Sequence, residues 1–299
     1  MERQIAAKKL AAGDRWFYII SYSIVSILVI AVLYPIIYVI SASFSSGNAI
    51  ATGKVWLWPV EFTLDGYAAV FKYKDIWIGY RNSILYTVAG TLINVCMTMI
   101  CAYPLSRKNL RGRNKIMFLF TFTMLFNGGM LPNYILISKL KMINTAWSLL
   151  LPGAISVYNM IVARTFIQSN IPDELLESSR IDGCDDIRFF FKMVLPLSKA
   201  ILAVLVIWYA VGHWNSYFNA FLYLNDKSKY PLQIYLREIL VLGEVQSDMI
   251  DGETESAIRN LKYLLKYSTI VVSTVPLYAI YPFIQKYFVK GVMIGSVKG

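Results

Sequence analysis

Six long apolar blocks constrain this 299-residue chain more than any other feature of its sequence. The apolar core of a lipid bilayer is about 30 Å thick, and a helix needs roughly 20 residues to cross it. Blocks of that length lie at residues 17–44, 82–103, 115–137, 146–167, 194–224 and 267–288. A water-soluble domain would instead show short apolar stripes at helix or strand spacing. Since 57% of the residues are hydrophobic and only 16% are charged, we predict an all-α polytopic membrane protein with six transmembrane helices.

Basic side chains cluster before the first and third blocks and predict the orientation of the chain. They are Arg3, Lys8, Lys9 and Arg15 before the first block, and Arg107, Lys108, Arg111, Arg113 and Lys115 before the third. Because short cytoplasmic loops are rich in Lys and Arg, both clusters and both termini are predicted to be cytoplasmic. The chain then divides into a cytoplasmic segment 1–16, a transmembrane domain 17–288 and a cytoplasmic tail 289–299. We interpret the net charge of +11 as a signal of this topology and of contact with lipid headgroups. Nucleic acid is therefore not a predicted partner.

The sequence lacks the patterns by which a chain of this kind would drive transport by itself or bind a metal ion. None of the apolar blocks carries Asp or Glu in its interior, where ion-coupled carriers usually bind the driving ion. No GxxxxGK[ST] phosphate loop occurs, so any ATP would be hydrolysed on another polypeptide. The three cysteines and the single histidine, His213, have no metal-ligand spacing, and we predict neither a metal site nor catalytic residues. A sodium-coupled carrier, with backbone carbonyls as sodium ligands, and a non-transporting membrane subunit are the alternative classes.

A charged insert separates the fourth and fifth apolar blocks, at residues 170–193. Pro172 and Asp173 are typical of a helix start, where acidic side chains favour the first turn. Gly183 is typical of a helix end, since glycine readily adopts the left-handed backbone of a C-cap. The segment "DDIRFFFKMV" then predicts a second helix. The insert is therefore a helix–turn–helix on the cytoplasmic surface that either fits a groove on a soluble partner or lies along the membrane without one.

The same insert resembles the EAA motif of ABC importer permeases, which reads E-A-A, then G, then nine residues, then I-x-L-P. Here the motif reads Glu177-Ser178-Ser179, Gly183, Met193 and Leu195-Pro196. Serines replace both alanines and methionine replaces isoleucine. The wording "IPDELLESSRIDG" and the ending "YPFIQKYFVKGVMIGSVKG" resemble the carbohydrate-uptake branch of this family, and within it the permeases of the LplC and YtcP type. The resemblance extends from the first apolar block to the last residue.

The resemblance implies half of a type I ABC importer in a bacterial cell membrane. Its implied partners are a second homologous permease subunit, two cytosolic ATPases, an extracellular solute-binding lipoprotein and a di- or oligosaccharide. ATP and Mg would act on the partner ATPase, with no cofactor on this chain. The residues that the resemblance places in ATPase coupling are Glu177, Ser178, Ser179, Asp182, Gly183, Leu195 and Pro196. Asp182 is equally consistent with a local turn cap.

Polar and aromatic residues within the apolar blocks are candidates for the solute pathway. They are Asn127, Asn133, Asn159, His213, Trp214, Asn215, Tyr217 and Asn219. The break at Asn127 indicates either unwound backbone lining a cavity or the outer end of a span. Asn215 and Asn219 are four residues apart, and on a continuous helix they would share one face that suits a sugar. The alternative is that the amides bond to a neighbouring helix while the aromatic side chains and His213 pack at an interface.

Overall fold

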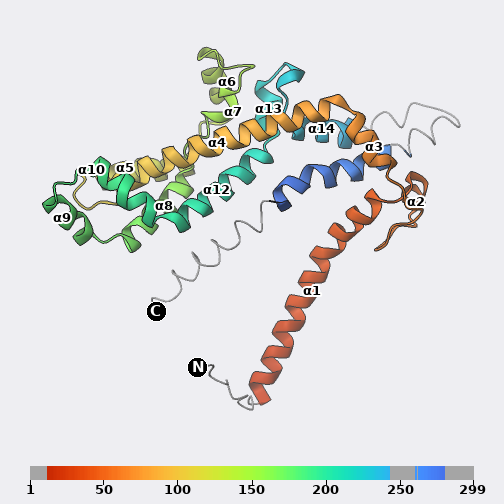
Figure 1. The fold of residues 1–299 in the computed structure, drawn as a ribbon, viewed down its shortest axis with the longest axis horizontal. Coiled ribbons are helices and arrows are strands. Elements are labelled where there is room, and N and C mark those ends of the chain that lie inside the picture. Colours follow the sequence, from red (N-terminus) through yellow and green to blue (C-terminus); the bar gives the residue numbers. More distant parts are fainter. Residues whose placement is uncertain (1–11, 243–259, 261, 280–299) are drawn as a thin grey trace. The chain divides into compact units, whose positions relative to one another are not determined.

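The computed structural model describes residues 12–242, 260 and 262–279, and these residues form helices and loops without any β-strand. The predicted all-α class is therefore confirmed. The described residues belong to two compact units (Figure 1). One unit draws on Met1–Lys72 and Leu242–Val272, and the other on Tyr73–Val241 and Ser273–Gly299.

The first unit is dominated by one long apolar helix, α1 (Ala12–Ser43). Nearly all of its large apolar side chains from Trp16 to Ile40 are exposed. Beyond α1 come α2 (Gly47–Ala51), α3 (Asp65–Lys72) and helical residues within 260–272, around a small core of Ala42, Ala49, Ile50 and Val55. A helix that is apolar on every side is stable only in lipid or against partner helices.

The second unit is built along α4 (Lys74–Ser106), with α8 (Val157–Asn170) and α12 (Lys199–Trp214) packed beside it. Figure 1 shows α12 running alongside α4, with α8 near the end of α4 that lies closest to α10. The shared core includes Met99, Met160, Ile167, Phe189 and Leu205. At the C-terminal end of α4, Arg164 Nε donates to the Leu105 carbonyl at 2.8 Å and Gln168 Nε2 donates to the Ser106 carbonyl at 3.1 Å. Side chains of α8 thus satisfy carbonyls that the end of α4 leaves unpaired.

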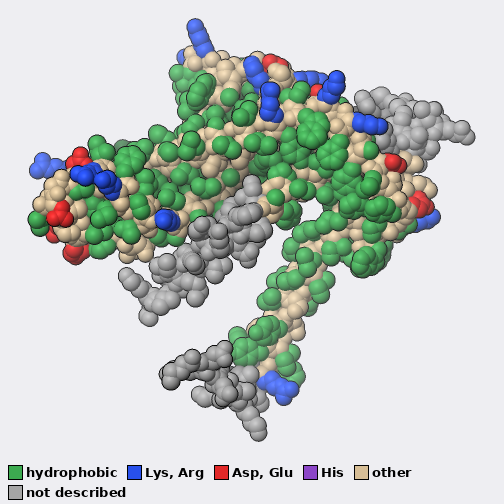
Figure 2. All heavy atoms as spheres, viewed as in Figure 1, with side chains coloured by type: hydrophobic (Ala, Val, Ile, Leu, Met, Phe, Trp, Pro, Cys, Tyr) green, Lys and Arg blue, Asp and Glu red, His purple; other side chains and the backbone are tan. Residues whose placement is uncertain are grey.

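The other helices of this unit are short. They are α5 (Arg113–Leu125), α6 (Met130–Lys139), α7 (Trp147–Leu150), α9 (Asp173–Ile181), α10 (Asp186–Phe189), α11 (Leu195–Leu197), α13 (Phe218–Tyr223) and α14 (Leu232–Arg237), with π-helical turns at Phe190–Val194 and Glu238–Leu242 and a 3-10 turn at Lys227–Lys229. Asn82 of α4 donates to the carbonyls of Ser228 and Tyr230, which fixes the loop before α14 to α4. Figure 2 shows apolar side chains over much of the visible face, and charged side chains gathered at the end that carries α9 and α10.

The prediction of six continuous spans is not confirmed. Among the described residues, only Arg15–Ser43 and Lys74–Ser106 are long and apolar enough to cross a bilayer as single helices. Two bent pairs bring the total to four at most: Arg113–Leu125 with Met130–Lys139, bent by 111°, and Asp186–Leu197 with Lys199–Trp214, bent by 80°. The predicted fourth block is divided by a loop between α7 and α8. The predicted sixth block and the tail 289–299 extend beyond the described residues.

Local chemistry explains both bends. In the first, the Asn127 amide oxygen accepts the Gly129 backbone N–H at 2.9 Å, and Gly129 has a φ of +85°. Asparagine side chains that bond nearby backbone favour turns over helices. In the second, Pro196 follows a π-helical turn, and both features bend helices.

Candidate functional site

The charged insert folds as the sequence predicts, into α9, a tight turn and α10. Gly183 has a φ of +76°, its N–H donates to the Arg180 carbonyl at 3.0 Å, and the Cys184 N–H donates to the Ser179 carbonyl at 2.9 Å. This pair of bonds is the Schellman arrangement that ends a helix on a left-handed glycine. Asp185 then begins α10 by accepting the Arg188 N–H at 2.7 Å. The turn is therefore specified by local hydrogen bonds on both sides of Gly183.

The motif residues divide between an exposed and a buried face of the insert. Glu177, Ser178, Asp182 and Gly183 are exposed. Ser179 is buried, and its hydroxyl donates to the Leu176 carbonyl at 2.8 Å. At the end of the motif Leu195 is half-buried and Pro196 is exposed. One face thus packs on the core while the other presents the Glu177 and Asp182 carboxylates.

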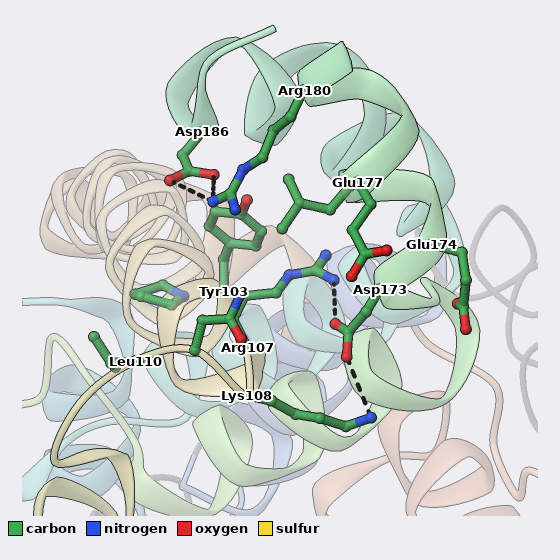
Figure 3. Close-up of a pocket in the computed structure, with 12 residues that line it drawn as sticks. Tyr103, Arg107, Lys108, Leu110, Asp173, Glu174, Glu177, Arg180 and Asp186 are labelled. Atoms are coloured by element: carbon green, nitrogen blue, oxygen red, sulfur yellow. Dashed lines mark hydrogen bonds and ion pairs between the residues drawn. The ribbon is translucent and has the colours of Figure 1, made fainter.

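A pocket of about 580 Å³ lies between α9 and the C-terminal end of α4 (Figure 3). Arg107 is buried beside it, and its Nη1 atom lies 3.3 Å from Asp173 Oδ1. Lys108 reaches the other oxygen of Asp173 at 3.3 Å, and Arg180 pairs with Asp186 at 3.0 Å. Figure 3 shows Glu177 at the same pocket, with its carboxylate directed toward the Arg107 side. The pocket is therefore lined by Glu177 of the motif on one side and by the C-terminal end of α4 on the other.

Sequence reasoning missed Arg107 and Tyr103 as parts of this site. Arg107 and Lys108 were interpreted only as topology signals, yet the structure buries Arg107 and leaves Lys108 exposed. A usable signal was the aromatic residue four positions before Arg107, because residues at that spacing meet on a helix face. The Arg107 guanidinium lies 5.1 Å from the Tyr103 ring centroid.

His213 takes part in a network of polar side chains between α4 and α12. His213 Nε2 lies 3.0 Å from Asn94 Oδ1, and Asn94 Nδ2 donates to the Gly153 carbonyl at 2.6 Å. Four residues away on each helix, about one turn, the Tyr209 and Thr98 hydroxyls are 2.7 Å apart, and Tyr209 also accepts the Ser156 N–H at 3.2 Å. The network joins two helices and the loop before α8. His213 is thus placed in a packed interface, which is one of the two roles that the sequence left open.

The predicted polar strip of the fifth block is not continuous, which corrects the sequence interpretation. Helix α12 ends at Trp214 and α13 begins at Phe218, so Asn215 and Asn219 do not share the face of one helix. Asn215 Nδ2 donates to the Val211 carbonyl at 3.0 Å, and such local bonds compete with helix continuation. Trp214 is buried, with its indole N–H donating to the Ser273 carbonyl at 3.1 Å. Asn215, Tyr217 and Asn219 are exposed.

The remaining pathway candidates are scattered. Asn127 lies in the exposed break between α5 and α6, Asn133 is exposed within α6, and Asn159 is buried in the first turn of α8. Cys96, Cys101 and Cys184 are free thiols. Within the described part of the chain, no group of three or more His, Cys, Asp or Glu side chains is arranged to hold a metal ion.

Comparisons with known proteins agree on one family. Residues 76–294 match the family model of the binding-protein-dependent transport system inner membrane component. The chain is 41% identical to the polygalacturonan/rhamnogalacturonan transport system permease protein YtcP of Bacillus subtilis (strain 168), over 96% of this chain and 99% of that protein. It is 40% identical to Protein LplC of the same organism, over 89% of this chain and 90% of that protein.

A solved structure is also similar over nearly the full length. It is a chain of a bacterial ABC transporter involved in the import of the acidic polysaccharide alginate. The two chains share 33% identity with a TM-score of 0.84, over 94% of this chain and 100% of that one. The chain belongs to the binding-protein-dependent transport system inner membrane component family, the non-enzymatic membrane permeases of ABC importers.

Proposed function

We propose that this chain forms half of the translocation pathway of an ATP-driven importer for an oligosaccharide in a bacterial cell membrane. The observation that carries the proposal is the α9–Gly183–α10 element, which stands at the position of the coupling motif in a chain that aligns from end to end with import permeases. A second homologous permease subunit, two cytosolic ATPases and an extracellular solute-binding lipoprotein complete the assembly. ATP and Mg act on the ATPases.

Fragments of acidic polysaccharides are the substrates to test first. Of the relatives described above, one is named for polygalacturonan and rhamnogalacturonan, and the solved structure for the acidic polysaccharide alginate. The permease protein GanQ of Bacillus subtilis (strain 168), named for galactooligosaccharides, is only 28% identical. The higher sequence identity to the proteins named for acidic polysaccharides thus favours acidic over neutral oligosaccharides as substrates.

The exposed face of α9 is proposed as the contact with the ATPase. Glu177 and Asp182 present carboxylates to basic side chains, and Gly183 sets the angle between α9 and α10. A short, locally specified element of this kind can pass a movement of the ATPase to the spans as a rigid body. The same proposal places both termini and the insert 170–193 on the cytoplasmic side, as the distribution of basic residues predicts.

The solute pathway is proposed to use the exposed amide and phenol groups between α12 and α13. Asn215, Tyr217 and Asn219 combine hydrogen-bonding groups with an aromatic face, and sugars offer hydroxyls and apolar C–H faces to both. Buried Trp214 and the Asn94–His213 pair hold this junction in place from behind. Asn127, Asn133 and Asn159 are proposed as further polar lining of the path.

The test is uptake into proteoliposomes that contain this chain and its three kinds of partner. We expect ATP-dependent uptake of oligogalacturonate or alginate oligosaccharides, and much weaker uptake of galactooligosaccharides. Omission of the binding protein, or replacement of ATP by a non-hydrolysable analogue, serves as the control. Uptake that continues without the ATPases and stops without a sodium gradient would instead identify a secondary carrier.

A further inference from the structure

Arg107 contacts three separate elements at the base of the insert. As the C-cap residue of α4, it places its guanidinium 5.1 Å from the Tyr103 ring centroid and 5.5 Å from that of Phe189 in α10. Its Nη1 atom donates to the Ile171 carbonyl at 3.4 Å and to Asp173 Oδ1 at 3.3 Å, at the start of α9. A single cation therefore joins the end of α4 to both helices of the insert.

The burial of Arg107 makes these contacts hard to exchange for water. Its side chain is only 10% exposed, and its Nε and Nη2 atoms are buried without a hydrogen-bond partner. A buried cation is costly unless it is paired, so loss of the Asp173 carboxylate would leave an uncompensated charge. The two aromatic faces add attraction to the guanidinium, most of whose surface is shielded from water. The position of α9 is therefore tied to the position of this guanidinium.

Lys108 provides an internal comparison. It reaches the same carboxylate at the same distance of 3.3 Å, but its side chain is 81% exposed. Ion pairs of exposed lysines are screened by water and contribute little. An ammonium also lacks the planar fork with which arginine fixes direction. Of the two cations on Asp173, Arg107 alone is placed to set the geometry.

The pocket beside α9 leaves the Arg107–Asp173 contact as one of the few connections between α9 and α4. The pocket of about 580 Å³ separates part of α9 from α4, so close packing does not fill the whole interface. The buried contacts that remain near α9 come from apolar side chains such as Leu176. Apolar contacts are non-directional and do not by themselves fix one helix against another.

We propose that Arg107 is the positioning residue that fixes α9 to the end of α4, so that a displacement of α9 carries α4 with it. This proposal rests on the proposed coupling function of α9. It assigns the exposed carboxylates of Glu177 and Asp182 to the ATPase, and Asp173, one turn before Glu177 at the start of α9, to attachment on α4.

The test measures the distance between α9 and α4 in the assembled transporter. Spin labels are placed at Ile181, which is 88% exposed on α9, and at Leu92, which is 64% exposed on α4. Leu92 lies roughly 20 Å along the helix from Arg107, at about 1.5 Å per residue. Cys96, Cys101 and Cys184 are replaced by serine, and the distance is recorded without nucleotide and after trapping with ATP and vanadate. This readout requires no knowledge of the transported sugar.

We expect one narrow distance that is the same in both states of the otherwise unchanged protein. Arg107→Met keeps an unbranched apolar stem but removes the guanidinium and its charge, and it should give a broad distribution that changes on trapping. The same variant should transport at least about tenfold less sugar per ATP hydrolysed. Arg107→Lys should be intermediate. Lys108→Gln, the matched control on the same carboxylate, should behave as the unchanged protein to within about twofold.

Asp173→Asn is the second variant, because its partly exposed side chain can change without leaving a cavity. It should reproduce the broad distribution, and the double variant Arg107→Met, Asp173→Asn should be no worse than Arg107→Met alone. A narrow, unchanged distance in Arg107→Met would overturn the proposal, as would equal damage from Lys108→Gln. Failure of both Arg107→Met and Asp173→Asn to assemble would also overturn it, since the contact would then serve folding alone. If the unchanged complex imports no acidic oligosaccharide but keeps the narrow distance, the proposed substrate fails and the role of Arg107 stands.

Discussion

At the scale of single residues, the insert depends on positions where backbone or burial leaves little choice. Gly183 is one, since its left-handed φ of +76° is unfavourable for residues with a Cβ. Ser179 is another, because it is only 7% exposed and packs toward the core. Ser178 is exposed and is not constrained in this way. The small residues of the motif therefore have different physical roles at adjacent positions.

Gly183→Pro should abolish uptake while the chain still inserts in the membrane. Proline fixes φ near −65° and removes the N–H that donates to the Arg180 carbonyl, so the Schellman turn cannot form. Gly183→Asn is the matched control, because asparagine tolerates the left-handed region and nothing lies within 4 Å of a Cβ at this position. The measurements are membrane level, ATPase binding and ATP-dependent uptake. Normal uptake with tight ATPase binding in Gly183→Pro would remove this turn from the mechanism.

Trp214→Ala and Asn215→Ala should affect different properties, protein stability and sugar uptake respectively, although the two residues are adjacent. Trp214 is 4% exposed, so its truncation leaves a cavity and should lower the free energy of unfolding by about 3–5 kcal/mol. Asn215 is exposed and bonds within its own helix, so its loss should change that free energy by no more than about 0.5 kcal/mol.

Thermal unfolding in detergent and sugar uptake separate the two effects. Reduced uptake by a normally stable Asn215→Ala variant would support its place in the solute pathway. A stable Trp214→Ala variant with altered sugar selectivity would contradict the packed role that the structure gives Trp214.

At the scale of elements, the contact between α4 and α12 combines close approach with a polar network. A Cβ built on Gly90 would overlap the His213 imidazole, so only glycine leaves room for the ring in its present position. The same imidazole bonds Asn94, which in turn holds the loop before α8. Polar contacts between helices are directional, and they fix one relative position of the three elements.

Gly90→Ala should destabilise this contact by about 1–3 kcal/mol, because the imidazole must move away from Asn94. Gly212→Ala is the control, since nothing lies within 4 Å of a Cβ at this exposed helical position. Alanine there should be neutral or stabilising by up to about 1 kcal/mol. Thermal unfolding of both variants provides the measurement. Equal stability of Gly90→Ala and the unchanged protein would show that His213 moves at no cost.

At the scale of the whole molecule, the exposed apolar surface shows that the chain does not function alone in water. α1 exposes apolar side chains along its length. The family is one of membrane subunits in larger transport systems, so energy and solute selection are shared among chains.

This chain reconstituted alone should therefore transport nothing above background. Its apolar blocks lack the carboxylate that ion-coupled carriers use, and its sequence has no phosphate loop. Uptake of labelled oligogalacturonate should appear only when the partner permease, ATPases and binding protein are added. Sugar uptake by the lone chain would rule out the half-permease assignment.

Features that depend on residues close together in the chain could be predicted before the structure was known. Apolar length predicted α1 and α4, and Pro172, Asp173 and Gly183 predicted where α9 begins and where it ends. These features follow from local chemistry, because helix caps and glycine turns involve residues only a few positions apart. The span count was less successful, because the break at Asn127 was open to two interpretations and the loop between α7 and α8 divides a block of nearly uniform hydrophobicity.

Only the tertiary structure decided which polar groups meet. Arg107 and Asp173 are 66 positions apart, and Asn94 and His213 are 119 apart. Tyr103 lies four positions before Arg107 and marks the helix face that Arg107 shares, but the burial of Arg107 and the exposure of Lys108 depend on how α9 and α10 pack against α4. The polar strip of the fifth block failed for a related reason: Asn215 bonds to its own helix and ends it, whereas apolar spacing predicted continuation. Contacts between distant segments arise from packing, and packing is a property of the folded chain rather than of any short stretch of its sequence.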